Sequence, residues 1–239
     1  MEKELKIRTP DKKIIYAKLR GSLKRPVVVI VHGLTSSILE ALYYNAARYF
    51  ESKGFSVLLF GLYDWRKPGR KLKDCTLKIH GRDIDTIVAY LHRKGAKRIH
   101  IIGHSYGAPS ILHSRDKRFD TVTFWDGSGD LRFLLKGKYI KAIRGRVMNV
   151  GCDVVIPEKL IRESKRVDVY SLIKKVDVPI KIICAGSGVL MSEGKRMFKV
   201  AKKPKSFAII KGATHNFDED GVQEKLYKAT ADWFKKNNA

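Results

Sequence analysis

A serine flanked by glycines stands at residues 103–107, which read Gly-His-Ser-Tyr-Gly. An apolar strand pattern at residues 98–102 precedes it, and a short helical pattern begins at Gly107. A turn this tight leaves its central side chain exposed, and glycines on either side remove Cβ atoms that would clash. We expect Ser105 to be a nucleophile for acyl transfer, with helix-terminal amides stabilising the negative charge. The alternative is a serine that only caps a helix.

A histidine that could serve as the base follows the last strand pattern of the chain. After the strand predicted at residues 206–210, residues 212–217 read Gly-Ala-Thr-His-Asn-Phe. A base must reach the serine oxygen and still transfer protons, and a loop after a rigid strand allows both. None of the other histidines occupies this place after the final strand, so His215 is the candidate base.

A third loop could supply hydrogen-bond donors. Residues 32–35 read His-Gly-Leu-Thr and follow a β-branched run at residues 27–31. Ligands bind where the carboxyl ends of parallel strands meet, so this loop can lie beside the nucleophile turn. Gly33 permits close backbone approach, and the N–H groups of Leu34 and Tyr106 would form a two-donor oxyanion hole. The alternative is an ordinary glycine turn whose histidine bonds a backbone carbonyl.

The order of these segments resembles the α/β-hydrolase family over residues 13–237. The resemblance implies that Ser105 and His215 hydrolyse an ester, thioester or amide through an acyl-enzyme, with no metal and no cofactor. The family also includes members with Asp or Cys nucleophiles. A serine argues against a haloalkane dehalogenase or epoxide hydrolase and departs from the cysteine of dienelactone hydrolases.

The third member of a triad, an acid that orients the base, departs from the family's usual pattern. The family usually places an Asp just after the penultimate strand, but residues 185–190 read Ala-Gly-Ser-Gly-Val-Leu. Asp126, at the end of an earlier strand, is the first substitute, although it could equally be a turn-forming residue. The remaining candidates are Glu193, Asp153 and Asp218, beside the alternative of no acid at all.

Short β-rich runs alternate with helical patterns, which predicts one α/β domain over residues 1–239 with a mostly parallel sheet and helices on both faces. Strands are predicted at residues 4–8, 13–19, 27–31, 55–60, 98–102, 121–125, 179–185 and 206–210. Helices are predicted at residues 38–53, 77–94, 107–114, 192–201 and 222–235. The first two strands would form an antiparallel hairpin, and Ser37 with Glu40 would form a capping box for the first helix.

Residues 127–176 interrupt this alternation between the last-but-two and last-but-one strands, and we expect a small cap over the pocket. A hairpin is predicted from residues 138–143 and 146–149 around Gly145, and a helix begins within residues 157–163. Its apolar side chains would line an acyl pocket or pack the cap on the sheet: Leu131, Phe133, Leu134, Tyr139 and Ile143. Its cations would favour an anionic substrate or lie in solvent: Arg132, Lys136, Lys138, Arg144 and Arg146.

Composition limits the remaining function classes. The chain of 239 residues is 44% hydrophobic, as in ordinary globular proteins, and has no apolar run long enough to span a bilayer. Its beginning lacks the apolar core of a secretory signal. Three scattered cysteines, Cys75, Cys152 and Cys184, argue against a disulfide framework or a metal site and predict a cytoplasmic protein.

The charge is unusual, because 49 Lys and Arg oppose 24 Asp and Glu for a net +25. Such a chain attracts polyanions at low salt. The cations are spread along the chain, with local concentrations at residues 66–73 and 195–205, and no nucleic-acid motif accompanies them. We therefore expect a solvated basic surface and no specific nucleic-acid partner.

Three hypotheses follow from these patterns. The first is a metal-independent carboxylesterase or thioesterase acting on a small acyl substrate. The others are a binding protein that keeps the fold without its acid, and a basic protein that binds polyanions non-specifically. Nothing in the sequence indicates an oligomeric state.

Overall fold

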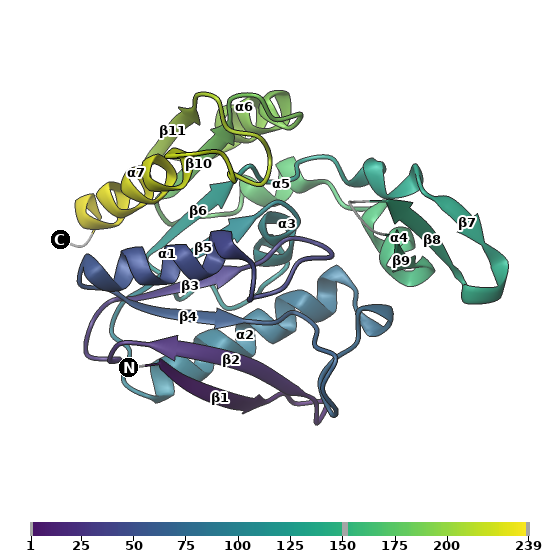
Figure 1. Ribbon diagram of the computed structural model, residues 1–239, viewed down its shortest axis with the longest axis horizontal. Helices are drawn as coiled ribbons and strands as arrows, with labels where there is room; N and C mark the ends of the chain where they lie inside the picture. Colours follow the sequence, from purple (N-terminus) through teal and green to yellow (C-terminus); the bar gives the residue numbers. More distant parts are fainter. Residues whose placement is uncertain (1, 150–152, 238–239) are drawn as a thin grey trace.

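The computed structural model describes residues 2–149 and 153–237, and its centre is an eight-stranded sheet in the order β1-β2-β4-β3-β5-β6-β10-β11 (Figure 1). The strands are β1 (Glu2–Arg8), β2 (Ile14–Arg20), β3 (Val27–Val31), β4 (Ser56–Phe60), β5 (Ile99–His104), β6 (Thr121–Trp125), β10 (Ile180–Ala185) and β11 (Lys205–Ile210). β1 and β2 pair antiparallel, as do β2 and β4, whereas the other neighbours run parallel. The mostly parallel sheet and its opening hairpin are confirmed.

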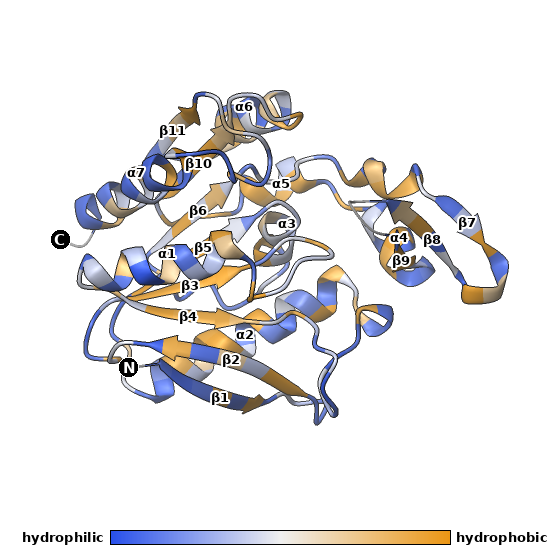
Figure 2. Ribbon diagram, in the orientation of Figure 1, coloured by the Kyte–Doolittle hydropathy of each residue, from blue (hydrophilic) through white to orange (hydrophobic). Residues whose placement is uncertain are grey.

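Helices cover both faces of the sheet. α1 (Ala41–Ser52) and α7 (Val222–Lys236) pack on one face. α2 (Leu77–Arg93), α3 (Gly107–Leu112) and α6 (Met191–Val200) pack on the other. Strands covered on both sides need apolar residues at every position rather than at alternate ones. β3 and β4 are accordingly buried throughout and apolar almost without interruption (Figure 2).

Among the element boundaries that differ from the prediction, two lie next to the candidate site. α1 begins at Ala41, not at residue 38, because Ser37 and Glu40 form a turn of their own before the helix. In that turn the Ser37 N–H donates to the Glu40 carboxylate at 3.2 Å, while the Ser37 hydroxyl accepts from the Leu39 N–H. β5 continues beyond the predicted end to His104, which pairs with Trp125 of β6. The strand therefore leads directly into the candidate nucleophile.

The inserted segment, residues 127–176, carries a second, three-stranded sheet in the order β7-β8-β9, which projects from the main body (Figure 1). Its elements are β7 (Lys138–Ile140), β8 (Gly145–Asn149), β9 (Asp153–Pro157), α4 (Glu158–Ser164) and α5 (Val169–Ile173). The predicted hairpin is present, but its turn is at residues 141–144 and Gly145 begins β8, paired with Ile140; β9 was not predicted.

The apolar residues of the insertion divide into three groups. Leu131 and Leu134 are buried in the core, and Phe133 packs against it. Tyr139 and Ile143, however, are 46% and 45% exposed. The expectation that all five would line a pocket or pack on the sheet was wrong for these two, because the sheet that carries them extends into solvent.

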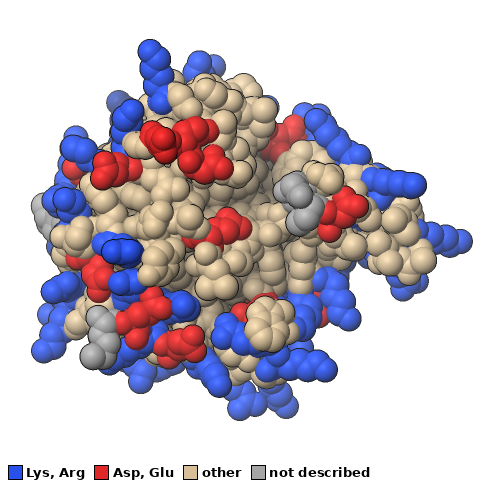
Figure 3. Space-filling view, viewed as in Figure 1, with Lys and Arg blue, Asp and Glu red and all other residues tan. Residues whose placement is uncertain are grey.

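Lysine and arginine side chains spread over the edges of the molecule, while the middle of the face in Figure 3 is mostly uncharged. One cation of the concentration at residues 66–73 is structural: Arg70 is buried and binds Asp83 at 2.6 Å and Asp11 at 3.0 Å. Cys75 and Cys184 are buried free thiols, and Cys152 lies outside the described residues. Within residues 2–149 and 153–237, no helix is long and apolar enough to cross a membrane.

Candidate active site

Ser105 occupies the sharp turn between β5 and α3, with a φ of 52° in a region that L-residues rarely adopt. Close packing explains both glycines of the motif. A Cβ on Gly107 would clash with the carbonyl oxygen of Val31, at the end of β3, and one on Gly103 would lie 2.8 Å from the Gly107 carbonyl carbon. The Ser105 N–H donates to the Trp125 carbonyl at 3.0 Å. The turn is thus fixed against both neighbouring strands.

The loop between β11 and α7 carries His215 to this serine. Its Nε2 lies 2.9 Å from Ser105 Oγ, and its Nδ1 lies 2.6 Å from Asp126 Oδ2. An ionised carboxylate can only accept, so Nδ1 carries the proton and the Nε2 lone pair faces the serine hydroxyl. The structure therefore brings together the three residues first chosen from the sequence, in the geometry of a nucleophile, a base and an orienting acid.

Asp126 follows β6, which lies between β5 and β10 in the sheet. Its side chain is fully buried, and its second oxygen accepts the Ala185 N–H at 3.1 Å. The glycine-rich turn at residues 185–190 encloses this carboxylate, since a Cβ on Gly188 would lie 3.1 Å from Asp126 Oδ2. The family usually places its acid in this turn. In this chain the turn instead packs against Asp126, which follows the neighbouring strand β6.

The other candidate acids lie elsewhere. Glu193 accepts the N–H groups of Gly129 and Asp130 at 2.6 and 2.8 Å, and burial raises the pKa of its carboxyl. Asp153 is exposed on β9. Asp218 accepts a hydrogen bond from the Thr214 hydroxyl at 3.4 Å. Among the described residues, none of these three carboxylates bonds to the imidazole of His215.

The histidine–glycine loop lies directly against the nucleophile. A Cβ on Gly33 would be 3.3 Å from the Cβ of Ser105. Within the described chain, neither the Leu34 amide nor the Tyr106 amide donates a hydrogen bond, which leaves both available to a substrate oxygen. His32 is buried, with Nδ1 2.7 Å from the Gly33 carbonyl and Nε2 accepting from a backbone amide at 2.9 Å. His32 is therefore held by backbone groups, and the role of this loop as a hydrogen-bond donor to substrate stays a prediction.

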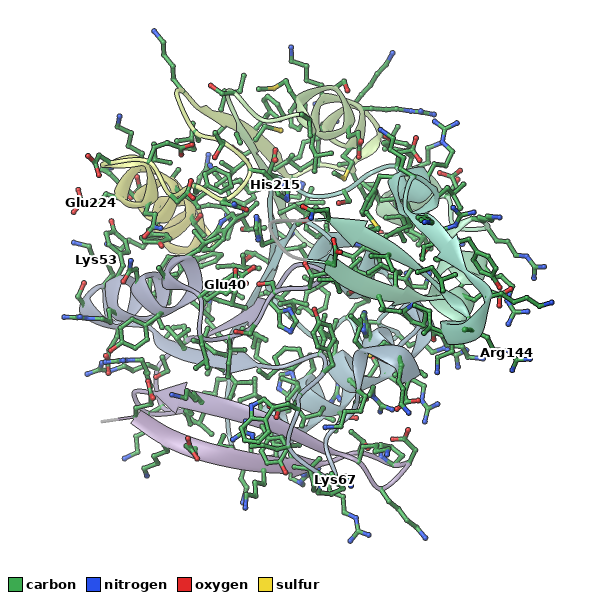
Figure 4. The ribbon with its side chains drawn as sticks, turned by 45° about the vertical axis from the view of Figure 1, so that its right-hand side comes forward. Glu40, Lys53, Lys67, Arg144, His215 and Glu224 are labelled. Carbon is green, nitrogen blue, oxygen red and sulfur yellow. The ribbon has the colours of Figure 1, made fainter. Side chains whose placement is uncertain are left out.

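A cavity of about 700 Å³ opens beside Ser105 and His215. Part of its lining is apolar: Leu34, Phe133, Met148, Ile156, Val189 and Leu190. Another part is polar and comes from the loop before α1, the His215 loop and α7: Ser36, Glu40, Asn216, Asp218 and Gln223. In Figure 4, His215 and Glu40 lie beside the inserted strands, while Arg144 lies at their far tip.

The charged groups of this lining are carboxylates, although the chain carries a net +25. The insertion cations do not line the cavity among the described residues. Arg132 instead pairs with Asp130, and Arg146 donates to the Leu135 carbonyl at 2.9 Å. The alternative that these cations bind an anionic substrate is therefore not favoured, because none of them belongs to the described lining of the cavity.

Sequence analysis missed two residues next to the site. Tyr43, in α1, is fully buried with its hydroxyl 2.8 Å from His104 Nδ1. His104 precedes the nucleophile, and its Nε2 lies 2.9 Å from the His215 carbonyl. The sequence signal was a histidine at the end of β5, a strand that also contains His100 among its apolar residues. No local pattern connects it to a tyrosine in a distant helix.

Comparison with protein-family models gives no match, and neither does comparison with curated protein sequences. Solved structures do match. Est1E from Butyrivibrio proteoclasticus, in its complex with ferulic acid, superimposes with a TM-score of 0.83 at 17% identity, over 98% of each chain. The chain has the α/β-hydrolase fold. The same fold is seen in an esterase domain from Rhodothermus marinus (TM-score 0.77, 15% identity, 99% of this chain and 98% of that one). Dienelactone hydrolase from Anabaena variabilis also shares it (TM-score 0.72, 15% identity, 99% and 98%).

Three of the buried histidines, His32, His80 and His104, make the stability of this α/β-hydrolase fold depend on pH. Burial lowers the pKa of His32 to about 4 and the pKa values of His80 and His104 to about 3. Unfolded histidines titrate near pH 6.5, so below that pH the unfolded chain binds protons that the folded chain excludes. Each histidine then lowers the free energy of unfolding by up to about 1.4 kcal/mol per pH unit, until the pH reaches its folded pKa.

We expect urea unfolding to show a lower free energy of unfolding at about pH 5 than at about pH 7. A His80→Gln variant should show a shallower dependence, because it removes one of the excluded protons. A free energy of unfolding at about pH 5 that equals or exceeds the value at about pH 7 would contradict this prediction.

Proposed function

We propose that this α/β-hydrolase-fold chain is a serine hydrolase that cleaves a carboxylic ester or thioester through an acyl-enzyme. The observation that carries the proposal is the continuous hydrogen-bonded line from Asp126 through His215 to Ser105, which ends at a cavity of about 700 Å³. The structural likeness to Est1E and to an esterase domain supports the same class of reaction.

In the proposed reaction, Ser105 Oγ attacks the substrate carbonyl while His215 Nε2 accepts its proton. The imidazolium then donates that proton to the leaving group, and water repeats the sequence to release the acid. Buried Asp126 stabilises the cation and keeps the proton on Nδ1. The amides of Leu34 and Tyr106 are proposed to bind the oxyanion, where one donor typically contributes about 10²–10³ in rate.

The cavity lining indicates the polarity of the substrate. We place the acyl group against the apolar residues Phe133, Met148 and Ile156, where each buried methylene contributes about 0.8 kcal/mol. The leaving group would lie towards Glu40 and Asp218. Salt screens the distant surface cations over about 8–10 Å, so these two carboxylates dominate the field that a bound leaving group experiences.

Replacement of Ser105 by Ala should abolish p-nitrophenyl ester turnover and labelling by a fluorophosphonate. The reason is that the variant lacks the oxygen that forms the covalent intermediate. Both are measured on the purified wild-type and variant proteins. Equal turnover by the variant would rule out the mechanism. A folded wild-type protein that neither turns over esters nor labels would instead favour the binding-protein hypothesis.

An Asp126→Asn variant should lose about four orders of magnitude in kcat, because an amide favours the wrong tautomer of His215. Glu193→Gln is the matched control, since its amide oxygen can still accept the N–H groups of Gly129 and Asp130. We expect its kcat to stay within about threefold of wild type. A near-normal rate for the Asp126 variant, or a large loss for the Glu193 variant, would reverse the assignment of the acid.

Phenyl esters of one acyl group that differ only in a cationic or anionic substituent on the phenol test the lining charge. We expect a higher kcat/KM for the cationic ester by about fivefold, corresponding to about 1 kcal/mol for partly exposed charges. Combined Glu40→Gln and Asp218→Asn changes should remove the difference. A preference for the anionic ester would show that the surface cations dominate instead.

A further inference from the structure

We infer that Tyr43 and His104 are positioning residues that hold the proposed oxyanion loop and the proposed base loop in register through one buried line of hydrogen bonds. The inference rests on the proposed function. The line runs from the Gly33 amide to the Tyr43 hydroxyl at 3.1 Å and from there to His104 Nδ1 at 2.8 Å. It continues from His104 Nε2 to the carbonyl oxygen of His215 at 2.9 Å.

The direction of every proton in this line is determined. A carbonyl oxygen can only accept, so His104 Nε2 carries a hydrogen and donates it to His215. The Nδ1 of a neutral imidazole must then accept, and the Tyr43 hydroxyl is its donor. The tyrosine oxygen in turn accepts the Gly33 N–H, and it also accepts from the Ser36 hydroxyl at 3.2 Å. The orientation of each group in the line therefore depends on the orientation of the group to which it is bonded.

Burial keeps the Tyr43 hydroxyl and the His104 imidazole from titrating. Tyr43 is fully buried and His104 is 5% exposed. Burial lowers the pKa of His104 to about 3, and the neighbouring imidazole of His215 acts in the same direction. Burial also raises the pKa of the Tyr43 hydroxyl well above its usual range. Both groups stay neutral over the pH range in which a serine esterase works, so they act by orientation rather than by proton transfer.

The positions of the bonded groups explain why their orientation would affect the proposed reaction. The Gly33 N–H belongs to the peptide immediately before that of Leu34, whose amide is a proposed oxyanion donor, so fixing it holds the backbone on the N-terminal side of that donor. At the other end, the bonded carbonyl belongs to His215 itself, and the His104 and His215 rings are 5.0 Å apart between centroids. His104 is also the neighbour of Ser105 in the chain. One line thus connects the backbone of the donor loop, the nucleophile turn and the base loop.

The first test removes a single oxygen. Tyr43→Phe keeps the ring in its buried site but leaves the Gly33 amide and His104 Nδ1 without their partner. We expect kcat and the rate of fluorophosphonate labelling to fall by between about tenfold and about a hundredfold, as a misplacement near 1 Å would cause. KM should stay within about twofold, and labelling should still reach completion, which shows that the sites are intact.

Tyr49→Phe is the matched control. This tyrosine lies in the same helix, and within the described residues its hydroxyl makes no hydrogen bond. Its kcat should equal that of wild type. A purely structural role for Tyr43 predicts a lower melting temperature or incomplete labelling with an unchanged rate for the labelled fraction, and that result would overturn the inference.

The second test exchanges the imidazole. His104→Gln offers an amide that can still donate to the His215 carbonyl, whereas His104→Leu offers none. We expect the Gln variant to retain at least about tenfold more kcat than the Leu variant. Equal rates in the two variants would overturn the positioning role.

A nitrogen-15 spectrum of the imidazoles supplies a readout that does not depend on turnover. In the wild-type protein His104 should be neutral with its proton on Nε2 between about pH 5 and pH 8. A proton on Nδ1 would overturn the line of hydrogen bonds. An inactive wild-type enzyme would overturn the proposed function and the positioning role together. An active wild type with unaffected Tyr43 and His104 variants would overturn only the positioning role.

Discussion

The buried carboxylate of Asp126 is the interaction on which the arrangement of the site depends. A charged group with no exposed surface is tolerated only when its oxygens are bonded, and here one oxygen faces His215 while the other accepts the Ala185 amide. Those partners come from the loop after β11 and from the last residue of β10. The sheet order β5-β6-β10-β11 brings them to the same edge. Removing any of these neighbours would leave the charge without the bonds that permit its burial.

The nucleophile turn obeys a second constraint, which is steric. α3 approaches the end of β3 so closely that residue 107 has no room for a Cβ, and residue 33 has little room beside Ser105. The glycines therefore set the distance between two strand ends rather than only the shape of one turn. The same proximity allows Tyr43 and His104 to connect the loop after β3 with the loop after β11.

Charge is distributed differently at the surface and in the cavity. The net +25 arises from side chains spread over the molecule (Figure 3), whereas the described charged residues of the cavity lining are Glu40 and Asp218. The surface cations would therefore attract anions at long range, whereas a molecule in the cavity would lie closest to the two carboxylates. The inserted segment contributes apolar side chains to the cavity, while Arg144 lies at its far tip (Figure 4).

Local sequence determined most of the elements and two of the three aligned residues. A strand–turn–helix around Ser105 and a histidine after the last strand depend on short-range patterns, namely apolar runs, flanking glycines and chain order. The choice of Asp126 over Glu193 depended instead on which strands are neighbours in space, and the sequence left it open. Three further features could not be predicted from the sequence. They are the third inserted strand, the exposure of Tyr139 and Ile143, and the contact of Tyr43 with His104. Each is a pairing between residues far apart in the chain, and only the packing of the sheet and its helices decides such pairings.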